Sequence, residues 1–189
     1  MNIGFAMCGS FCTFDNVFPV LESIAQKHCV IPILSGAAAS IDSRFGTADA
    51  HLDRIVAICG KKPLCTIQEV EPIGPKKLLD ALVIAPCTGN TLAKLAHSIA
   101  DSSVTMAAKS HLRNGRPVIL AISTNDALAG AAENIGRLLG KRNYYFVPFG
   151  QDDPYGKPTS IVADFSQTLS TLEAALEGRQ LQPILCGST

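Results

Sequence analysis

The strongest constraint on the fold is an apolar run at 81–85 that no polar residue interrupts. A strand that is covered by helices on both faces has this pattern, whereas a strand with one face in water alternates. Similar short apolar runs occupy residues 3–8, 30–34, 118–122 and 144–147. We predict strands at all of these places, with a weaker strand at 66–70 and with Pro86 ending the strand at 81–85.

Apolar residues at helical spacing fill the segments between these runs. After the first run, Val17, Leu21 and Ile24 recur at intervals that place them on one face of a helix. Helices are predicted in the same way at 52–59, 88–99, 104–112, 126–139 and 161–176. Strands that alternate with helices pair in parallel through right-handed crossovers. The sequence therefore predicts an α/β, single-domain, Rossmann-like (flavodoxin-like), doubly wound parallel sheet of about five to six strands.

Length and composition favour one packed domain. With 189 residues, of which 47% are hydrophobic and 17% charged, the chain is too apolar for disorder and too short for two full-sized domains. We predict the domain at 1–178 and a C-terminal tail at 179–189. The 16 basic and 16 acidic residues cancel, so no positive field attracts nucleic acid. The low charged fraction favours a homo-oligomer, with an alanine-rich monomer as the alternative.

Signals of membrane insertion, secretion and metal binding are missing from the sequence. No apolar run reaches the roughly 18 residues of a transmembrane helix, and the first residues carry no positive charge, so we expect a cytoplasmic protein. The 7 cysteines lack paired C-x-x-C spacing, which argues against a disulfide framework and a zinc site. The histidines at 28, 51, 97 and 111 are interpreted as surface or core residues of helices, and no metal is predicted.

Glycine and serine follow the first two predicted strands. Gly9-Ser10 and Ser35-Gly36 each stand at the entrance of a helix, where backbone amides favour an anion. Because ligands of open parallel sheets bind beyond the carboxyl ends of the strands, the two turns would meet at one phosphate. Two ordinary strand-to-helix turns are the alternative. A dinucleotide or nucleoside triphosphate is not the first choice, since GxGxxG and a Walker lysine are both missing.

Polar loops also follow the next two strands. Residues 86–91 (PCTGNT) and 123–126 (STND) either cap the helices that follow them or bind a flat ring that is rich in heteroatoms. The segment 149–158 (FGQDDPYGKP) is polar and too long for a simple turn, so we interpret it as a functional loop. No GxSxG is present, which argues against a serine hydrolase.

The stretch 85–128 resembles the core signature of the flavoprotein family that contains cysteine decarboxylases and flavin prenyltransferases. The resemblance is carried by PCTGNT at 86–91, LAKLA at 92–96, Ala100-Asp101 and the turn into a strand at 113–119. It implies a Rossmann-like fold, trimers or dodecamers of trimers, and FMN bound between protomers. The residues that it implies for the cofactor are Gly9, Ser10 and Ser35 at the phosphate, and Thr88, Asn90 and Ser123 at the ring.

Departures from the family pattern bear on the reaction. The decarboxylases carry a histidine where this chain has EPIGP at 71–75, and a cysteine in the loop equivalent to 149–158, which has none. Flavin prenyltransferases carry an Arg-Glu pair where this chain has Thr124-Asn125. We therefore expect neither oxidative decarboxylation of a peptidyl cysteine nor prenyl transfer.

One branch of the family resembles this sequence along nearly the whole chain. The matching segments are SRFG at 43–46, EPIGPK at 71–76, 86–90 with 95–96, STNDAL at 123–128, PFGQDDP at 148–154 and LQPIL at 181–185. Proteins of this branch work with an NAD(P)-dependent partner, in the mother cell of sporulating bacteria, to make an aromatic pyridine dicarboxylate. The resemblance implies an oxidoreductase component that helps remove two electrons from the precursor. A phosphate- or flavin-binding component without catalysis is the alternative.

Cationic side chains in and near these segments are the candidates for binding a dicarboxylate substrate. We name Arg44, Lys76 and Arg113, because a guanidinium or ammonium group matches a carboxylate in charge and in hydrogen bonding. Arg113 also has a simpler interpretation, as a solvated residue in the turn at the end of a helix.

Glu71 and Asn125 are the candidate catalytic residues. Glu71 occupies the segment that carries histidine in the decarboxylases, and Asn125 follows the fourth main strand. Asp152 and Asp153 are alternatives for the general base, since they belong to the 149–158 loop. A loop that excludes water when it closes would suit flavin chemistry.

Overall fold

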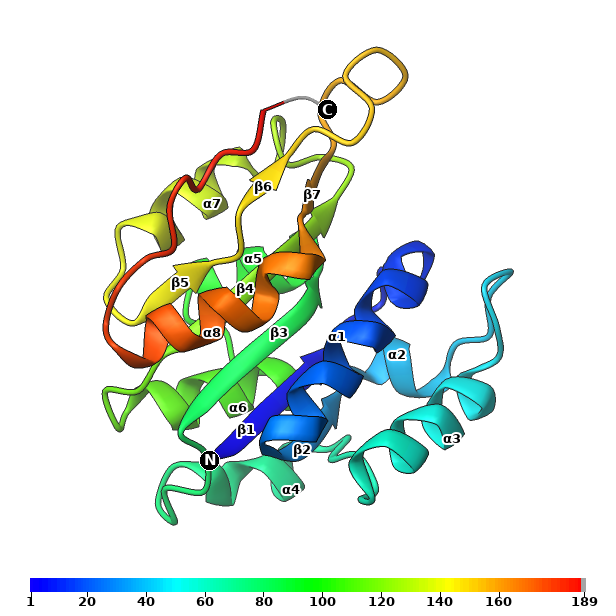
Figure 1. The fold of residues 1–189 in the computed structure, drawn as a ribbon, viewed down its shortest axis with the longest axis vertical. Coiled ribbons are helices and arrows are strands. Elements are labelled where there is room, and N and C mark those ends of the chain that lie inside the picture. The colour runs from blue at the N-terminus through cyan, green and yellow to red at the C-terminus, as the bar shows by residue number, and fades with distance from the viewer. Residues whose placement is uncertain (188–189) are drawn as a thin grey trace.

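The computed structural model describes residues 1–187, and its centre is a seven-stranded sheet. Five of the strands run parallel, in the order β2-β1-β3-β4-β5. Their bounds are β1 Asn2–Met7, β2 Cys29–Leu34, β3 Ala81–Cys87, β4 Val118–Thr124 and β5 Tyr144–Phe146. This order is that of flavodoxin-like, doubly wound sheets. The predicted fold class is confirmed (Figure 1).

Helices cover both faces of the sheet (Figure 1). On one face α1 contacts α3 and α8, and on the other α6 contacts α4 and α5, which contacts α7. The long helices are α1 Phe14–Lys27, α3 Ala48–Cys59, α5 Gly89–Ala96, α6 Ser103–Leu112, α7 Ala132–Leu139 and α8 Thr168–Leu176. Every residue of β3 is buried between the two layers, which explains its unbroken apolar sequence.

Short helices occupy several connections. They are α2 Gly36–Ser40, α4 Ile67–Val70 and the 3-10 helices η1 Phe11–Thr13, η2 Glu71–Ile73 and η3 Phe165–Gln167. The predicted weak strand at 66–70 is wrong, because Thr66 and Glu69 form a capping box that starts α4. Each of these side chains bonds the other's backbone amide and so satisfies two donors of the helix end.

The prediction of one helix at 161–176 is wrong in its first part. Residues Ile161–Ala163 form β7, which pairs antiparallel with β4 and with β6 (Phe149–Gly150). Asp164 then begins η3, since its carboxylate accepts a hydrogen bond from the Ser166 amide at 3.1 Å. Three apolar residues are too few to distinguish the period of a strand from that of a helix. β6 and β7 bring the sheet to seven strands.

Smaller differences concern where elements begin and end. Pro86 does not end β3 but lies inside it, and the pairing with β4 shifts register there, because proline has no amide to donate. The helix predicted at 126–139 begins only at Ala132, after turns. Gly60 caps α3 in the left-handed conformation, with φ +64°, as glycine does most readily.

The segment after α8 returns along β5 and β6 (Figure 1). The Gln180 side chain accepts from the Phe146 amide at 2.8 Å and donates to the Phe146 carbonyl at 2.7 Å. Further on, the Phe149 amide donates to the Ile184 carbonyl at 3.0 Å. The tail boundary at 179 remains a prediction, and residues 188–189 of that tail lie outside the described residues. Among the helices within 1–187, none has the length and apolar character that crossing a membrane requires.

Candidate functional site

A cavity of about 380 Å³ opens at the carboxyl ends of β1, β2 and β3. Four residues that the sequence predicts for the cofactor line it: Gly9, Ser35, Thr88 and Asn90. They come from three loops that are far apart in the chain. The parallel sheet brings them together, because consecutive parallel strands end at the same edge.

The loops after β1 and β2 approach each other closely at this cavity. A Cβ built on Gly9 would lie 3.2 Å from the Cβ of Ala37, whereas one on Gly36 would meet nothing within 4 Å. Ser35 caps α2, since its Oγ accepts a hydrogen bond from the Ala38 amide at 3.3 Å. The amides of the first turn have no acceptor within the helix. Because Gly36 and Ala37 line the cavity, the amides of this turn that Ser35 does not cap are available to an anion.

The loop after β3 contributes the start of α5. Thr88 caps the helix, and its Oγ accepts from the Thr91 amide at 3.3 Å while the two hydroxyls lie 3.1 Å apart. Gly89 permits a close approach to the loop after β4, because a Cβ there would lie 2.8 Å from Thr124 Oγ1 and 2.9 Å from Asp126 Oδ1. Thr88 therefore has its predicted capping role, and it lines the cavity as well.

A buried thiol forms part of the cavity wall. The Thr91 hydroxyl donates to Cys8 Sγ at 3.3 Å. Burial raises the pKa of the Cys8 thiol to about 11, although hydrogen bonds with Thr91 and the Thr88 backbone act in the opposite direction. The thiol is thus neutral at physiological pH and unsuited to act as a nucleophile.

One cation lies in the cavity wall. Lys94 is half-buried on α5, and its Nζ lies 2.9 Å from an Asp101 carboxylate oxygen. The hydrogen bond from Lys94 lowers the pKa of Asp101, which therefore stays ionised. Because the carboxylate of Asp101 lies outside the lining, the cavity itself presents amides, hydroxyls and an ammonium group. This donor set suits a phosphate.

Ser10 and Ser123, which the sequence assigns to the cofactor, contact each other. Their Oγ atoms lie 2.7 Å apart, and Ser123 is buried at the carboxyl end of β4. β3 lies between β1 and β4 in the sheet, so this bond ties the loop after β1 across the end of β3. Neither side chain lines the 380 Å³ cavity, but Ser10 directly follows Gly9, which does.

Asn125 joins the turn after β4 to the residues that directly follow the 149–158 loop. Its side-chain Oδ1 accepts from the Ser160 hydroxyl at 3.4 Å, and its carbonyl accepts from Thr159 Oγ1 at 2.6 Å. Within the loop, Lys157 Nζ lies 3.1 Å from Asp152 Oδ2. Burial raises the pKa of Asp152, but hydrogen bonds with Ser160 and Lys157 outweigh burial and lower it. An ionised Asp152 is a poor proton acceptor while Lys157 holds it.

The remaining predicted residues divide between two sides of the sheet. We call the side where the parallel strands end the carboxyl edge, and the side where they begin the amino edge. Arg44 is exposed in the 43–46 turn, which connects α2 to α3. Glu71 and Lys76 lie in and after η2, just before β3, and Arg113 lies at the end of α6, just before β4. An Asn114 amide bond to the Gly74 carbonyl at 3.0 Å joins these two segments. Glu71, Lys76 and Arg113 are therefore at the amino edge, away from the cavity.

Six residues that line the cavity were not among the predicted cofactor-binding residues: Cys8, Gly36, Ala37, Thr91, Lys94 and Ser102. Lys94 is four positions after Asn90 on a predicted helix, so both side chains lie on the same face, and this spacing was a usable signal. Ser102 caps α6, where its Oγ accepts from the Thr105 amide. A serine just before the predicted helix at 104–112 was a second usable signal. Cys8 offered no such signal.

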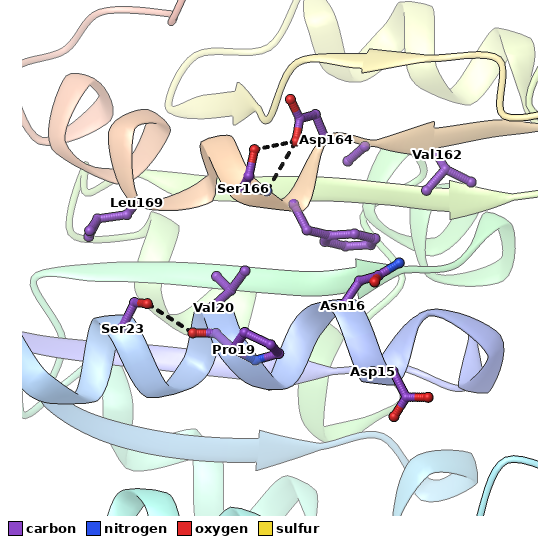
Figure 2. Close-up of a pocket in the computed structure, with 11 residues that line it drawn as sticks. Asp15, Asn16, Pro19, Val20, Ser23, Val162, Asp164, Ser166 and Leu169 are labelled. Atoms are coloured by element: carbon purple, nitrogen blue, oxygen red, sulfur yellow. Dashed lines mark hydrogen bonds between the residues drawn. The ribbon is translucent and has the colours of Figure 1, made fainter. Parts of the chain in front are cut away.

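A larger groove of about 610 Å³ lies elsewhere, between α1 and the β7–η3–α8 segment (Figure 2). Its lining includes the apolar Val20, Phe165 and Leu169 and the acidic Asp15 and Asp164. Figure 2 shows that the Asp164 carboxylate is used to cap η3 through Ser166. The groove contains none of the predicted site residues. Across residues 1–187, no group of three or more metal-ligating side chains comes together.

Comparison with known proteins supplies the context of this site. A family model described as Flavoprotein matches residues 1–140. The dipicolinate synthase B subunit of Bacillus subtilis (strain 168) is 45% identical over 185 residues, which are 97% of this chain and 92% of that protein. The crystal structure of the dipicolinate synthase B subunit from Bacillus halodurans C has a TM-score of 0.91 and 42% identity, and the match covers 100% of this chain and 97% of that chain.

A more distant structure shares the fold. DmrB of Burkholderia xenovorans, solved in complex with FMN, has a TM-score of 0.70 and 18% identity, over 93% of this chain and 95% of that chain. The two Bacillus proteins match at much higher identity and over nearly the full length. The resemblance in the sequence is confirmed, and the chain belongs to the Flavoprotein family and, within it, to the family of dipicolinate synthase B subunits.

Proposed function

We propose that this chain acts as the B subunit of a dipicolinate synthase, binds FMN, and takes part in oxidising a dihydro- or hydroxytetrahydrodipicolinate to dipicolinic acid. The observation that carries the proposal is the cavity at the ends of β1, β2 and β3, with its backbone amides and hydroxyls. The similarity to the two Bacillus proteins supports the role as a synthase component. The FMN bound by DmrB supports the choice of flavin.

The residues around the cavity fit FMN. Ser35, the first-turn amides of α2 and the backbone at Gly9 suit the phosphate, since they are donors beside open space. Thr88 and Asn90 offer hydroxyl and amide groups to the carbonyl and nitrogen atoms of a flavin ring, and Ser123, which contacts Ser10, offers a further hydroxyl. When bound, a flavin accepts two electrons, which is the change that separates a dihydropyridine from an aromatic pyridine.

Arg44 and Asn125 are the substrate-facing residues in this proposal, because both lie at the edge of the sheet that holds the cavity. Glu71, Lys76 and Arg113 lie at the other edge, so they would act on substrate only across a contact with another copy. We therefore keep the homo-oligomer, a trimer or dodecamer, as part of the proposal. The A subunit of dipicolinate synthase would be the partner that carries NAD(P), in the mother cell of a sporulating bacterium.

A second candidate function is a protein that binds phosphate or flavin and supports its partner without chemistry of its own. One observation favours it: within the described part of the chain, no carboxylate or histidine lines the cavity. The one thiol there, Cys8, has a raised pKa and stays protonated. A general base would then have to come from the 149–158 loop or from another copy of the chain.

The visible spectrum of the purified protein distinguishes the two functions. FMN is added, free flavin is removed by gel filtration, and substrate is then supplied without oxygen. A flavin band that co-elutes and bleaches supports the oxidoreductase. Retained flavin that does not bleach, or a colourless protein on which synthase activity still depends, supports the second function. Ser35→Ala should lower FMN retention, whereas Ser40→Ala, at the end of the helix that Ser35 caps and outside the cavity, should not.

A further inference from the structure

The 43–46 turn presents Arg44 at its exposed tip. The Ser43 amide donates to the Gly46 carbonyl at 3.0 Å, and the Gly46 amide donates to the Ser43 carbonyl at 3.1 Å. Ser43 Oγ also accepts from the Phe45 amide at 3.1 Å. The Arg44 guanidinium lies 4.8 Å from the centre of the Phe45 ring. These bonds close a tight turn but leave both of its tip side chains in solvent.

His51 lies directly beneath this turn. Gly46 has φ +129°, and a Cβ on it would lie 2.8 Å from Cε1 and 2.9 Å from Nε2 of the His51 ring. Glycine is required there on two counts, since the backbone conformation disfavours other residues and the imidazole fills the space. His51 is only 8% exposed, although histidine has a polar ring. The His51 ring therefore limits how closely the backbone of the turn can approach α3.

Neighbouring residues hold the His51 ring in place. The ring centre lies 4.9 Å from that of Phe14, at an angle of 70°, and 6.0 Å from that of Phe18. Asp42 Oδ1 accepts from the Ala48 amide at 2.9 Å, which ties the segment before the turn to the start of α3. Among the described residues, His51 Nε2 has no hydrogen-bond partner. The ring acts as an aromatic surface and not as a hydrogen-bonding group.

Burial leaves the His51 ring neutral at physiological pH. Burial lowers the pKa of His51; Asp15, on α1, acts against this and Arg54, on α3 itself, acts with it. Arg54 is held away by Glu22, 3.3 Å from it, and by the Phe18 ring. On the turn segment the charged groups are Asp42 and Arg44. A proton on Nε2 would place charge against Gly46, where no described residue accepts it.

We propose that His51 is a positioning residue, whose neutral imidazole is the platform on which the 43–46 turn rests and which thereby sets the place of Arg44. The second half of this proposal rests on the proposed function, in which Arg44 binds a substrate carboxylate. His51→Ala removes the ring that supports Gly46. His51→Phe keeps an aromatic ring at this place, but that ring cannot take up a proton.

Cleavage by trypsin after Arg44 tests the platform without any need for activity. New chains that begin at Phe45 are counted by mass spectrometry at pH 7.5, in the full chain. His51→Ala should speed this cleavage by about tenfold or more, because the turn opens more often. His51→Phe and the control Asp53→Ala, an exposed residue of α3, should stay near the wild-type rate. Unchanged cleavage in a folded His51→Ala protein would overturn the platform.

Acidification provides a test that does not depend on His51→Ala folding. The Gly46 and Phe45 amide resonances are followed from pH 7.5 to pH 5 in the wild type and in His51→Phe. They should shift or broaden in the wild type alone, since only there can the ring take up a proton. Equal changes in both proteins would overturn the proposal.

Steady-state kinetics in the complex with the NAD(P)-dependent partner tests the link to Arg44. His51→Ala should raise the KM of the dicarboxylate with little change in kcat, and His51→Phe should restore it. Faster cleavage with an unchanged KM would leave the platform standing and overturn the link, because Arg44 would then not bind substrate. The two failures are therefore distinguishable.

Discussion

The two edges of the parallel sheet differ in what their loops do with polar groups. At the carboxyl edge, Gly9, Ser35 and Thr88 line an open cavity. At the amino edge the polar groups bond one another, as Asn114 does to the Gly74 carbonyl and Arg116 does to the Leu79 carbonyl. The same kinds of residue thus line an open cavity at one edge and hold the chain together at the other.

A buried histidine makes this contrast measurable. His111 lies at the amino edge, fully buried, with its Nε2 3.1 Å from the Pro117 carbonyl and its Nδ1 without a partner in residues 1–187. Burial lowers the pKa of His111 to about 4, against a smaller raising effect of the hydrogen bond to Pro117. Charging this ring inside the protein is therefore costly.

The largest effect that we predict is loss of stability in acid through His111. The folded pKa lies below the unfolded one, so its contribution is complete above pH 6.5 and is lost as the pH falls toward 4. The unfolding free energy should fall over this range by up to roughly 3 kcal/mol more in the wild type than in His111→Gln. Urea melts at several pH values measure this, and the exposed His97→Gln is the control. Parallel curves for wild type and His111→Gln would contradict the prediction.

A matched pair of glycines sharpens the comparison. A Cβ on Gly74 would lie 2.7 Å from the Ser110 backbone oxygen, at the amino edge, and one on Gly89 would crowd Thr124 and Asp126 at the carboxyl edge. Gly74→Ala should cost about 2 kcal/mol of unfolding free energy and leave FMN affinity unchanged. Gly89→Ala should weaken FMN binding by about tenfold with a smaller loss of stability. Urea melts and a flavin fluorescence titration measure both. The contrast between the two edges would be wrong if Gly74→Ala weakened FMN binding more than Gly89→Ala does.

Replacing Arg44 and Arg113 in turn tests whether the two edges of the sheet act separately. Arg44→Gln should raise the KM of the dicarboxylate by about tenfold in the complex with the NAD(P)-dependent partner, since a charge-assisted bond is lost. Arg113→Gln should leave KM unchanged if only residues at the carboxyl edge of the same chain bind the substrate. A larger effect from Arg113→Gln would mean that the amino edge of another copy completes the site.

The smallest effect concerns the hydroxyl pair at the carboxyl edge. Ser10→Ala and Ser123→Ala should each weaken FMN binding by about threefold to fivefold, because each removes the 2.7 Å bond between these side chains. The double variant should lose little more than either single one, since both remove the same contact. A flavin fluorescence titration of the wild type, the two single variants and the double variant completes this double-mutant cycle. Additive losses would show that the two hydroxyls act separately.

Sequence reasoning reached the carboxyl edge because its signals are local. Glycine and serine directly after an apolar run identify a strand-to-helix turn, and parallel strands end together, so Gly9, Ser35 and Thr88 could be placed around one cavity. The same rule could have placed Glu71 and Arg113 at the other edge, since they come shortly before β3 and β4. Family resemblance assigned Glu71 to the site in spite of its position.

Other features depend on contacts between distant segments. β7 exists because Ile161 and Val162 pair with Thr124 and Ser123, and three residues carry no periodicity that could show this. His51 was interpreted as an ordinary helix residue, because nothing in its own neighbourhood of the sequence indicates that Phe14 would lie against it. Such contacts are decided by packing and not by local propensity.

The pairing of Ser123 and Thr124 with β7 has a consequence for the order in which the chain is synthesised. A nascent chain that has reached residue 140 already contains β1 to β4, which make up most of the parallel sheet. The last residues of β4 nevertheless have no antiparallel neighbour until 161–163 have left the ribosome. A prematurely ended chain could thus form the parallel core, while the loop that carries Ser123 and Asn125 lacked its support.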